Sequence, residues 1–262
     1  MQTFSMLELA RAGPVATVRL NRPDLHNAFN PTMIAELTAC FQGLAVDPLA
    51  RVVVLTGAGR SFCAGADIQW MRESLDFSSA ENLTDAERLA AMYDAVDGLP
   101  KPLIGRINGA AIGGGAGLVA CCDLAIATER ARFGFTEVKL GILPAVIGRF
   151  VAPKIGAGHA RALFVSGTRF DAARAAALGL VHEVVAEDAL DEAVARAVAE
   201  MLTSAPGAAA SAKALVKALA TLPPAERRAY TVAAIAEARM GAEARAGLRA
   251  FLDKSAPPWS AE

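Results

Sequence analysis

The feature that most constrains this chain is a run of four glycines within five positions, inside the segment 112–118. The run follows a short apolar stretch, 102–107, and precedes a helix-like segment, 118–122. An ordered glycine loses more backbone entropy than any other residue, so such a run is expected where side chains cannot be tolerated. We therefore expect bare backbone N–H groups at a helix start. The helix dipole there favours an anion, or an oxygen that becomes negative during a reaction.

Three kinds of ligand site compete as interpretations of this glycine run. A P-loop requires Gly-Lys followed by Ser or Thr, and the chain contains no Gly-Lys pair. Gly115, Gly117 and Ala120 fit the G-x-G-x-x-A fingerprint of dinucleotide-binding proteins, but the match lies mid-chain and lacks the usual opening strand–turn–helix unit. An oxyanion hole is the third interpretation, and close packing of a helix on a sheet, without any ligand, is the fourth possibility. The glycine run alone does not decide among them.

Charge and hydropathy exclude several classes of partner. The 262 residues carry a net charge of −1, so there is no global field to attract nucleic acid or an anionic membrane. No window holds about 18 uninterrupted apolar residues, so no membrane span is expected. The first nine residues lack a basic region followed by an apolar core and do not resemble a signal peptide. We expect a cytoplasmic protein without nucleic-acid or membrane partners.

Cysteine and histidine give no indication of a metal site. The four cysteines, Cys40, Cys63, Cys121 and Cys122, show no C-x-x-C spacing. Only three histidines are present, and none pairs at a spacing typical of metal ligands. We interpret the cysteines as buried thiols in a reducing compartment.

Strand and helix patterns alternate along most of the chain, which predicts an α/β fold. Strands are expected at 7–9, 15–20, 51–56, 123–128, 131–135 and 181–185. Helices are expected at 31–46, 86–99, 118–122 and 172–178. The polar and acidic segment 72–87 is predicted to be mobile. From residue 190 the pattern is helical, with breaks at Pro206 and at Pro223-Pro224, which divides the chain into a core, 1–205, and a helical C-terminal segment, 206–262.

A second turn of small residues, at 61–68, also lies between a strand and a helix. Asp67 is placed in the first turn of the helix that follows. This turn is a second place where bare N–H groups could point at one ligand. The strand–turn–helix unit thus occurs twice, about 50 residues apart, which suggests an architectural repeat.

Three motifs follow one another along the chain: SFCAGADI at 61–68, NGAAIGGG at 108–115, and FGFTE at 133–137 with LGILP at 140–144. Their order and spacing closely resemble the enoyl-CoA hydratase/isomerase (crotonase) superfamily. The resemblance extends over essentially the whole chain, because NRP with NA near residues 21–28 and the ending from Phe251 to Trp259 are also similar to that family.

The resemblance implies a crotonase-like spiral of ββα units with a C-terminal helical oligomerisation domain. It implies a homotrimer or a hexamer built as a dimer of trimers, an acyl-CoA thioester as substrate, and no separate cofactor. The N–H groups of Ala66 and Gly114 would hold the thioester oxygen. Coenzyme A would lie along the core and also reach the tail of a neighbouring subunit. The residues implied in its binding are His26, Ala28, Ala64, Ala66, Asp67, Ile68, Phe251 and Lys254.

One departure from the family pattern concerns the catalytic carboxylates. Hydratases of the family typically carry two glutamates, and this chain has Gly117 at the position of the first and Glu137 at the second. A carboxyl group in a dry acyl pocket is expected to have a raised pKa, which suits proton transfer near neutral pH. Gly117→Glu would restore the pair of glutamates in the sequence. A single glutamate suits either water addition or movement of a double bond.

The sequence segments around Gly117 and Glu137 look most like those of hydratases of the methylglutaconyl-CoA type, which also lack the first glutamate. This favours an enoyl-CoA hydratase acting on a branched or carboxylated acyl chain. A substrate carboxylate would need a cation, and Arg72, Lys139 and Arg149 are the candidates. A Δ3-Δ2 enoyl-CoA isomerase is the alternative, and a non-catalytic acyl-CoA-binding protein is a third interpretation.

Overall fold

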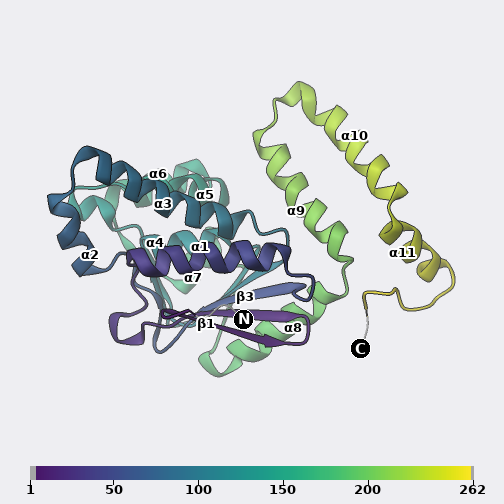
Figure 1. The fold of residues 1–262 in the computed structure, drawn as a ribbon, viewed down its shortest axis with the longest axis horizontal. Helices are drawn as coiled ribbons and strands as arrows, with labels where there is room; N and C mark the ends of the chain where they lie inside the picture. The colour runs from purple at the N-terminus through teal and green to yellow at the C-terminus, as the bar shows by residue number, and fades with distance from the viewer. Residues whose placement is uncertain (1–3, 261–262) are drawn as a thin grey trace.

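A six-stranded sheet stands at the centre of the computed structural model, which describes residues 4–260 (Figure 1). All neighbouring strands are parallel except the β1–β2 hairpin. Parallel strands buried on both faces read as continuous apolar runs, and every residue of β3 is buried. In spatial order the strands are β1 (Leu7–Ala12), β2 (Val15–Leu20), β3 (Val52–Gly57), β5 (Leu103–Ile107), β7 (Leu124–Thr128) and β10 (Glu183–Val185).

A second sheet consists of four strands of three residues each. They are β4 (Ser61–Cys63), β6 (Ala110–Ile112), β8 (Arg132–Gly134) and β9 (Arg169–Asp171). Each of β4, β6 and β8 directly follows a strand of the first sheet and precedes a helical segment. This succession is the ββα spiral that the family resemblance implied.

Helices cover both faces of the larger sheet (Figure 1). The core helices are α1 (Pro31–Val46), α2 (Ile68–Glu73), α3 (Ser79–Asp97), α4 (Gly114–Cys121), α5 (Ala145–Ile155), α6 (Ala157–Ser166), α7 (Ala172–Ala177) and α8 (Leu190–Leu202). Short 3-10 helices are η1 (Pro23–Leu25), η2 (Ser74–Asp76), η3 (Glu137–Leu140) and η4 (Glu187–Ala189). Side chains of β3 alternate between two cores: Val53 and Leu55 join the larger cluster with α1, and Val52 and Val54 pack with α8.

The helix predicted at 31–46 is confirmed, with the side chain of Asn30 accepting from the N–H of Met33 as its cap. Two other parts of the secondary structure differ from the sequence prediction. The prediction of a mobile segment at 72–87 is wrong, because α3 begins at Ser79 with a capping box between Ser78 and Glu81. The prediction failed because the first turns of α3 expose charged side chains and carry no apolar stripe. The strands β4, β6 and β9 were also missed, since three residues are too few to show a period.

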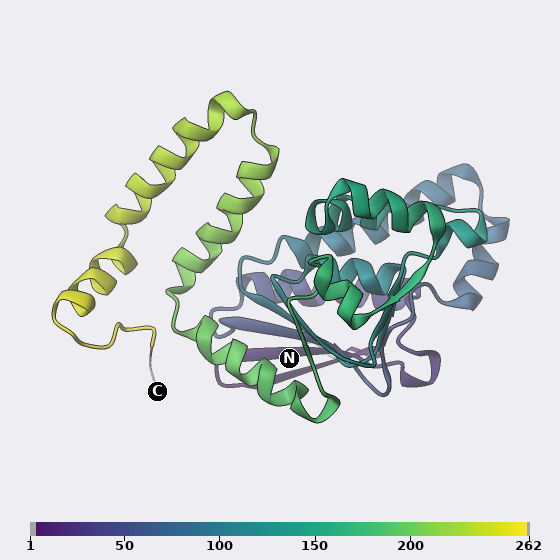
Figure 2. The ribbon, with the colours of Figure 1, turned by 180° about the vertical axis from the view of Figure 1, so that it is seen from behind.

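The C-terminal helices form an arm that projects from the core in both views (Figures 1 and 2). The arm contains α9 (Pro206–Thr221), α10 (Pro224–Met240) and α11 (Ala242–Leu252), and the first two begin at the predicted prolines. Within the part of the chain described here, no helix is both long enough and apolar enough to cross a bilayer. Apolar side chains exposed on the arm are Val216, Val232, Ile235, Met240, Leu248, Phe251 and Leu252.

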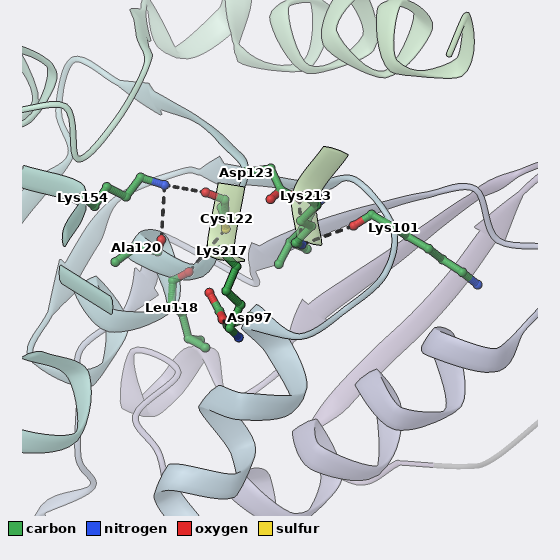
Figure 3. Close-up of polar contacts among 10 residues, drawn as sticks. Asp97, Lys101, Leu118, Ala120, Cys122, Asp123, Lys154, Lys213 and Lys217 are labelled. Atoms are coloured by element: carbon green, nitrogen blue, oxygen red, sulfur yellow. Dashed lines mark hydrogen bonds and ion pairs between the residues drawn. The ribbon is translucent and has the colours of Figure 1, made fainter. Parts of the chain in front are cut away.

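Polar contacts join α9 to the core (Figure 3). Lys213 pairs with Asp123 at 2.9 Å, and Lys217 pairs with Asp97 at 2.8 Å. In the same region, Lys154 of α5 donates to the carbonyls of Ala120 and Cys122. A cation at these carbonyls stabilises the C-terminal end of α4, the helix that begins within the glycine run.

Candidate active site

The two turns of small residues lie against each other because β4 and β6 pair in parallel. Their backbones are in contact. A Cβ built on Gly65 would lie 2.9 Å from the carbonyl oxygen of Ile112 and 3.8 Å from the backbone nitrogen of Gly114. A Cβ on Gly115 would lie 2.2 Å from the carbonyl oxygen of Cys63. Side chains at Gly65 and Gly115 would therefore separate the turns, which explains part of the glycine run.

Ala66 presents an N–H that the sheet does not use. It forms an isolated parallel bridge with Phe29, in which the Phe29 N–H donates to the Gly65 carbonyl and the Asp67 N–H donates to the Phe29 carbonyl, both at 2.7 Å. In a parallel bridge of this kind, the middle residue directs its own N–H away from the partner strand. Ala66 is partly exposed while Gly65 and Asp67 are buried.

Gly114 presents a second such N–H. It is the first residue of α4, and the first N–H groups of a helix have no acceptor within the helix. Gly113 precedes it with a positive φ of 53°, which favours glycine, and donates its own N–H to the Gly134 carbonyl at 2.8 Å. Gly114 is partly exposed between buried neighbours. The structure thus brings the two predicted donors, Ala66 and Gly114, to one place at the positive end of α4.

The carboxyl group of Glu137 lies beside the glycine turn. Glu137 begins η3, and a Cβ built on Gly113 would lie 3.0 Å from its Oε1. Its Oε2 is buried and has no hydrogen-bond partner among residues 4–260. Burial raises the pKa of Glu137 above its ordinary value, although a hydrogen bond to its own backbone N–H opposes the rise. A carboxyl group in this state suits proton transfer near neutral pH.

A cavity of about 670 Å³ opens next to Ala66. An ion pair supports its wall: Arg22 contacts Asp67 at 2.8 Å and donates to the Ala28 carbonyl at 2.6 Å. Burial alone would raise the pKa of Asp67, but Arg22 and the N–H groups of Gln69 and Trp70 lower it. All six core residues predicted to contact coenzyme A line this cavity: His26, Ala28, Ala64, Ala66, Asp67 and Ile68.

The sequence profile of enoyl-CoA hydratase/isomerase matches residues 10–262. The chain belongs to the enoyl-CoA hydratase/isomerase family. An enoyl-CoA hydratase from Shewanella pealeana has the same fold, with a TM-score of 0.94, 36% identity, and coverage of 98% of this chain and 96% of that one. The (E)-benzylidenesuccinyl-CoA hydratase of Thauera aromatica is 38% identical over 178 residues, 67% of this chain and 68% of that protein. An enoyl-CoA isomerase/hydratase of Mycosarcoma maydis is 38% identical over 175 residues, 63% of each protein.

Membership of the enoyl-CoA hydratase/isomerase family makes this protein an enzyme of hydratase or isomerase type. The interpretation as a non-catalytic binding protein is therefore not supported. Within the family, this member departs from the two-glutamate pattern at Gly117. A Cβ built there would lie 2.4 Å from Ile147 Cγ2 and 3.0 Å from Tyr93 Cε1. A side chain at position 117 would therefore require Ile147 and Tyr93 to shift, so the effect of Gly117→Glu stays a prediction.

Two predicted residues lie apart from the cavity in this enoyl-CoA hydratase/isomerase family member. Phe251 lies in the last turn of α11 with 81% of its surface exposed, and Lys254 follows that helix. Figures 1 and 2 place α11 on the arm, away from the core. Within one chain neither residue lines the cavity. Their contact with a neighbouring subunit stays a prediction.

The three candidate cations differ in their surroundings, although all are exposed. Arg149 pairs with Asp94 and lies over the ring of Phe150. Arg72 donates to the side chain of Gln69 at 3.0 Å. Lys139 forms no ion pair within residues 4–260 and lies on η3, two positions after the glutamate. The residues that sequence reasoning missed, Tyr93 and Ile147, pack on the glycine turn from α3 and α5, and no local motif marks them.

Proposed function

We propose that this enzyme adds water to a 2-enoyl-CoA thioester, with Glu137 as its only proton-transfer side chain. The observation that carries the proposal is the carboxyl of half-buried Glu137, which lies against the glycine turn with a buried Oε2 that has no hydrogen-bond partner among residues 4–260. The N–H groups of Ala66 and Gly114 lie beside it, where the two turns of small residues meet. An acid–base group beside two preorganised donors is the arrangement that water addition to a thioester requires.

The chemistry proceeds in two steps. Water bonds to C3 of the acyl chain and gives a proton to Glu137, while the electrons of the double bond move to the thioester oxygen as an enolate. The N–H groups of Ala66 and Gly114 stabilise that negative oxygen, and loss of one such donor typically costs about 3–4 kcal/mol of barrier. Glu137 then returns the proton to C2. Coenzyme A stays attached throughout as the carrier part of the substrate, lying in the cavity beside Ala66.

The proposed acyl chain carries a free carboxylate in addition to the thioester, as in 3-methylglutaconyl-CoA. The resemblance around Gly117 and Glu137 supports this, as does the relative whose substrate name contains a succinyl group. Lys139 is the proposed partner of that carboxylate, since it shares η3 with Glu137. Its stem lies along Gly167, where a Cβ would be 3.1 Å from both Cγ and Cε of Lys139.

Turnover of a set of thioesters tests this assignment. Loss of the absorbance of the conjugated thioester should be fast with 3-methylglutaconyl-CoA and slower with crotonyl-CoA. Lys139→Ala should raise KM for 3-methylglutaconyl-CoA without changing KM for crotonyl-CoA, and Arg72→Ala serves as the matched control. Equal preference for both thioesters, or an effect of Arg72→Ala in place of Lys139→Ala, would contradict the assignment.

Isomerisation is the second candidate activity. One observation favours it: Ile147 and Tyr93 leave no room for a second carboxylate beside Gly117, and a single base can carry a proton between two carbons. A relative at 38% identity is named an isomerase/hydratase. Conversion of a 3-enoyl-CoA to the 2-enoyl-CoA without any water addition would replace hydration by isomerisation as the main activity.

The proposed assembly is a homotrimer or a dimer of trimers. Its support is the arm, whose exposed apolar side chains include Val216, Ile235 and Phe251. In this assembly Phe251 and Lys254 reach a neighbour's coenzyme A. Light scattering should give three or six times the chain mass of 27.1 kDa. Truncation before Arg249 should raise KM for CoA esters more than it lowers kcat, and a monomer with unchanged KM would contradict the assembly.

A further inference from the structure

A hydrogen bond from Tyr93 ties helix α3 to the glycine turn. Tyr93 is fully buried, and its hydroxyl donates to the carbonyl of Gly114 at 2.7 Å. By α-helix geometry the same carbonyl accepts the N–H of Leu118, so the bond from Tyr93 is additional to the helix's own. A phenylalanine would fill the apolar surroundings without a hydroxyl group to satisfy. The hydroxyl therefore acts as a directional contact with one glycine.

Tyr93 also confines Gly114 from the side, together with Phe29. A Cβ built on Gly114 would lie 2.9 Å from Tyr93 Oη and 2.7 Å from Phe29 Cε2. Gly114 cannot shift in that direction, yet it remains partly exposed elsewhere on its surface. Its freedom is thus removed on the packed side while its N–H stays available.

The Tyr93 hydroxyl keeps its proton near neutral pH. Burial raises its pKa well above 10, and the neighbouring Cys63, Cys121 and Glu137 raise it further. The group is therefore a constant hydrogen-bond donor and does not exchange protons with Glu137 near neutral pH. This leaves a geometric role for Tyr93 and separates it from acid–base chemistry.

We propose that Tyr93 is a positioning residue of this active site, whose hydroxyl fixes Gly114 so that the Gly114 N–H points at the thioester oxygen. The proposal rests on the proposed oxyanion hole at Ala66 and Gly114. It does not depend on whether the enzyme hydrates or isomerises its substrate, because both reactions pass negative charge to that oxygen.

The test uses Tyr93→Phe, with Tyr230→Phe as the matched control, since Tyr230 on α10 is the chain's other tyrosine. The probe is 4-dimethylaminocinnamoyl-CoA, whose absorption moves to longer wavelength when its carbonyl is polarised. Tyr93→Phe should bind the probe within about twofold of wild type but lose most of the wavelength shift. With crotonyl-CoA, kcat should fall about tenfold at unchanged KM. Tenfold corresponds to about 1.4 kcal/mol, the upper range for one hydrogen bond. Tyr230→Phe should match wild type.

The wavelength shift of the bound probe reports the position of the Gly114 N–H separately from the stability of the fold and from the rate of hydration. A lower melting temperature for Tyr93→Phe with an undiminished wavelength shift would overturn the proposal, because the hydroxyl would then serve folding alone. Absence of any shift in the wild type would overturn it as well. A shift present in the wild type and lost in Tyr93→Phe would support it even if no enoyl-CoA were hydrated, in which case only the hydration proposal fails.

Discussion

Ile147 of α5 occupies the space into which a side chain at position 117 of α4 would extend, with its Cγ2 atom 2.4 Å from the place of a Cβ on Gly117. Tyr93 closes the same space from α3. The absence of the first glutamate is thus matched by close packing of α3 and α5 around Gly117. The chain's own packing keeps Glu137 as the single carboxyl at the glycine turn.

This packing predicts the effect of adding one methyl group. Gly117→Ala should lower the free energy of unfolding by about 1–3 kcal/mol, the usual effect of overpacking a core. Gly158→Ala is the matched control, because Gly158 also lies within a helix but has no atom within 4 Å of its Cβ position. The control should be neutral or stabilising by up to about 1 kcal/mol. Urea denaturation measures both, and equal stability of the two variants would contradict the packing argument.

The same contact predicts how a second carboxylate could be introduced. Gly117→Glu alone should fold poorly, because it adds both volume and a buried charge. Combined with Ile147→Ala it should regain stability relative to the single variant. The two variants are compared by thermal denaturation and by crotonyl-CoA turnover. A single Gly117→Glu variant as stable as wild type would show that the space around residue 117 opens without help from Ile147.

Ala66 offers a direct test of the first N–H donor. Proline at this position removes an N–H that the bridge with Phe29 does not use. Ala66→Pro should therefore lower kcat by about 10²–10³ while the protein remains folded. Ala66→Gly keeps the N–H and should retain most of the activity. Wild-type turnover in a folded Ala66→Pro variant would remove Ala66 from the site.

The ion pair of Arg22 and Asp67 predicts a pH-dependent stability. The folded state lowers the pKa of Asp67, so its contribution is fully present at neutral pH and is lost as the pH falls through that lowered pKa. Asp67→Asn should reduce the free energy of unfolding at pH 7. The difference from wild type should shrink as the pH drops below about 3.9, the ordinary aspartate value. Urea titrations over this range measure it, and a constant difference would contradict the assignment.

Sequence reasoning located the two turns because their signals are local, and the family resemblance then named Ala66 and Gly114 as the donors within them. Each donor sits in a turn of small residues directly after a strand, and parallel pairing of β4 with β6 brings the two turns together. The contacts that tighten the site could not be predicted in this way. Tyr93 meets Gly114 across 21 positions, and that meeting depends on how α3 packs against α4. The polar start of α3 was itself misassigned, although its capping box at Ser78 and Glu81 is a local signal, because its first turns are exposed and carry no apolar stripe.

Glu137 should also determine the acid side of the pH–rate profile. Its pKa is raised by burial, and the carboxyl must be unprotonated to accept a proton from water. As the pH falls through that raised value, kcat/KM should decline, and the decline should begin above the ordinary glutamate value of about 4.3. A profile that stays flat down to that value would show that burial does not govern the catalytic group.

Replacement of Glu137 by glutamine tests the central claim most directly. Glu137→Gln keeps the size of the side chain but cannot take a proton, so kcat for the preferred enoyl-CoA should fall by about 10²–10⁴. The Kd for the same thioester should stay within a few fold, because the N–H donors and the cavity are untouched. Glu129→Gln, at an exposed glutamate after β7, should behave as wild type. Full activity in Glu137→Gln would show that the proton-transfer group lies elsewhere.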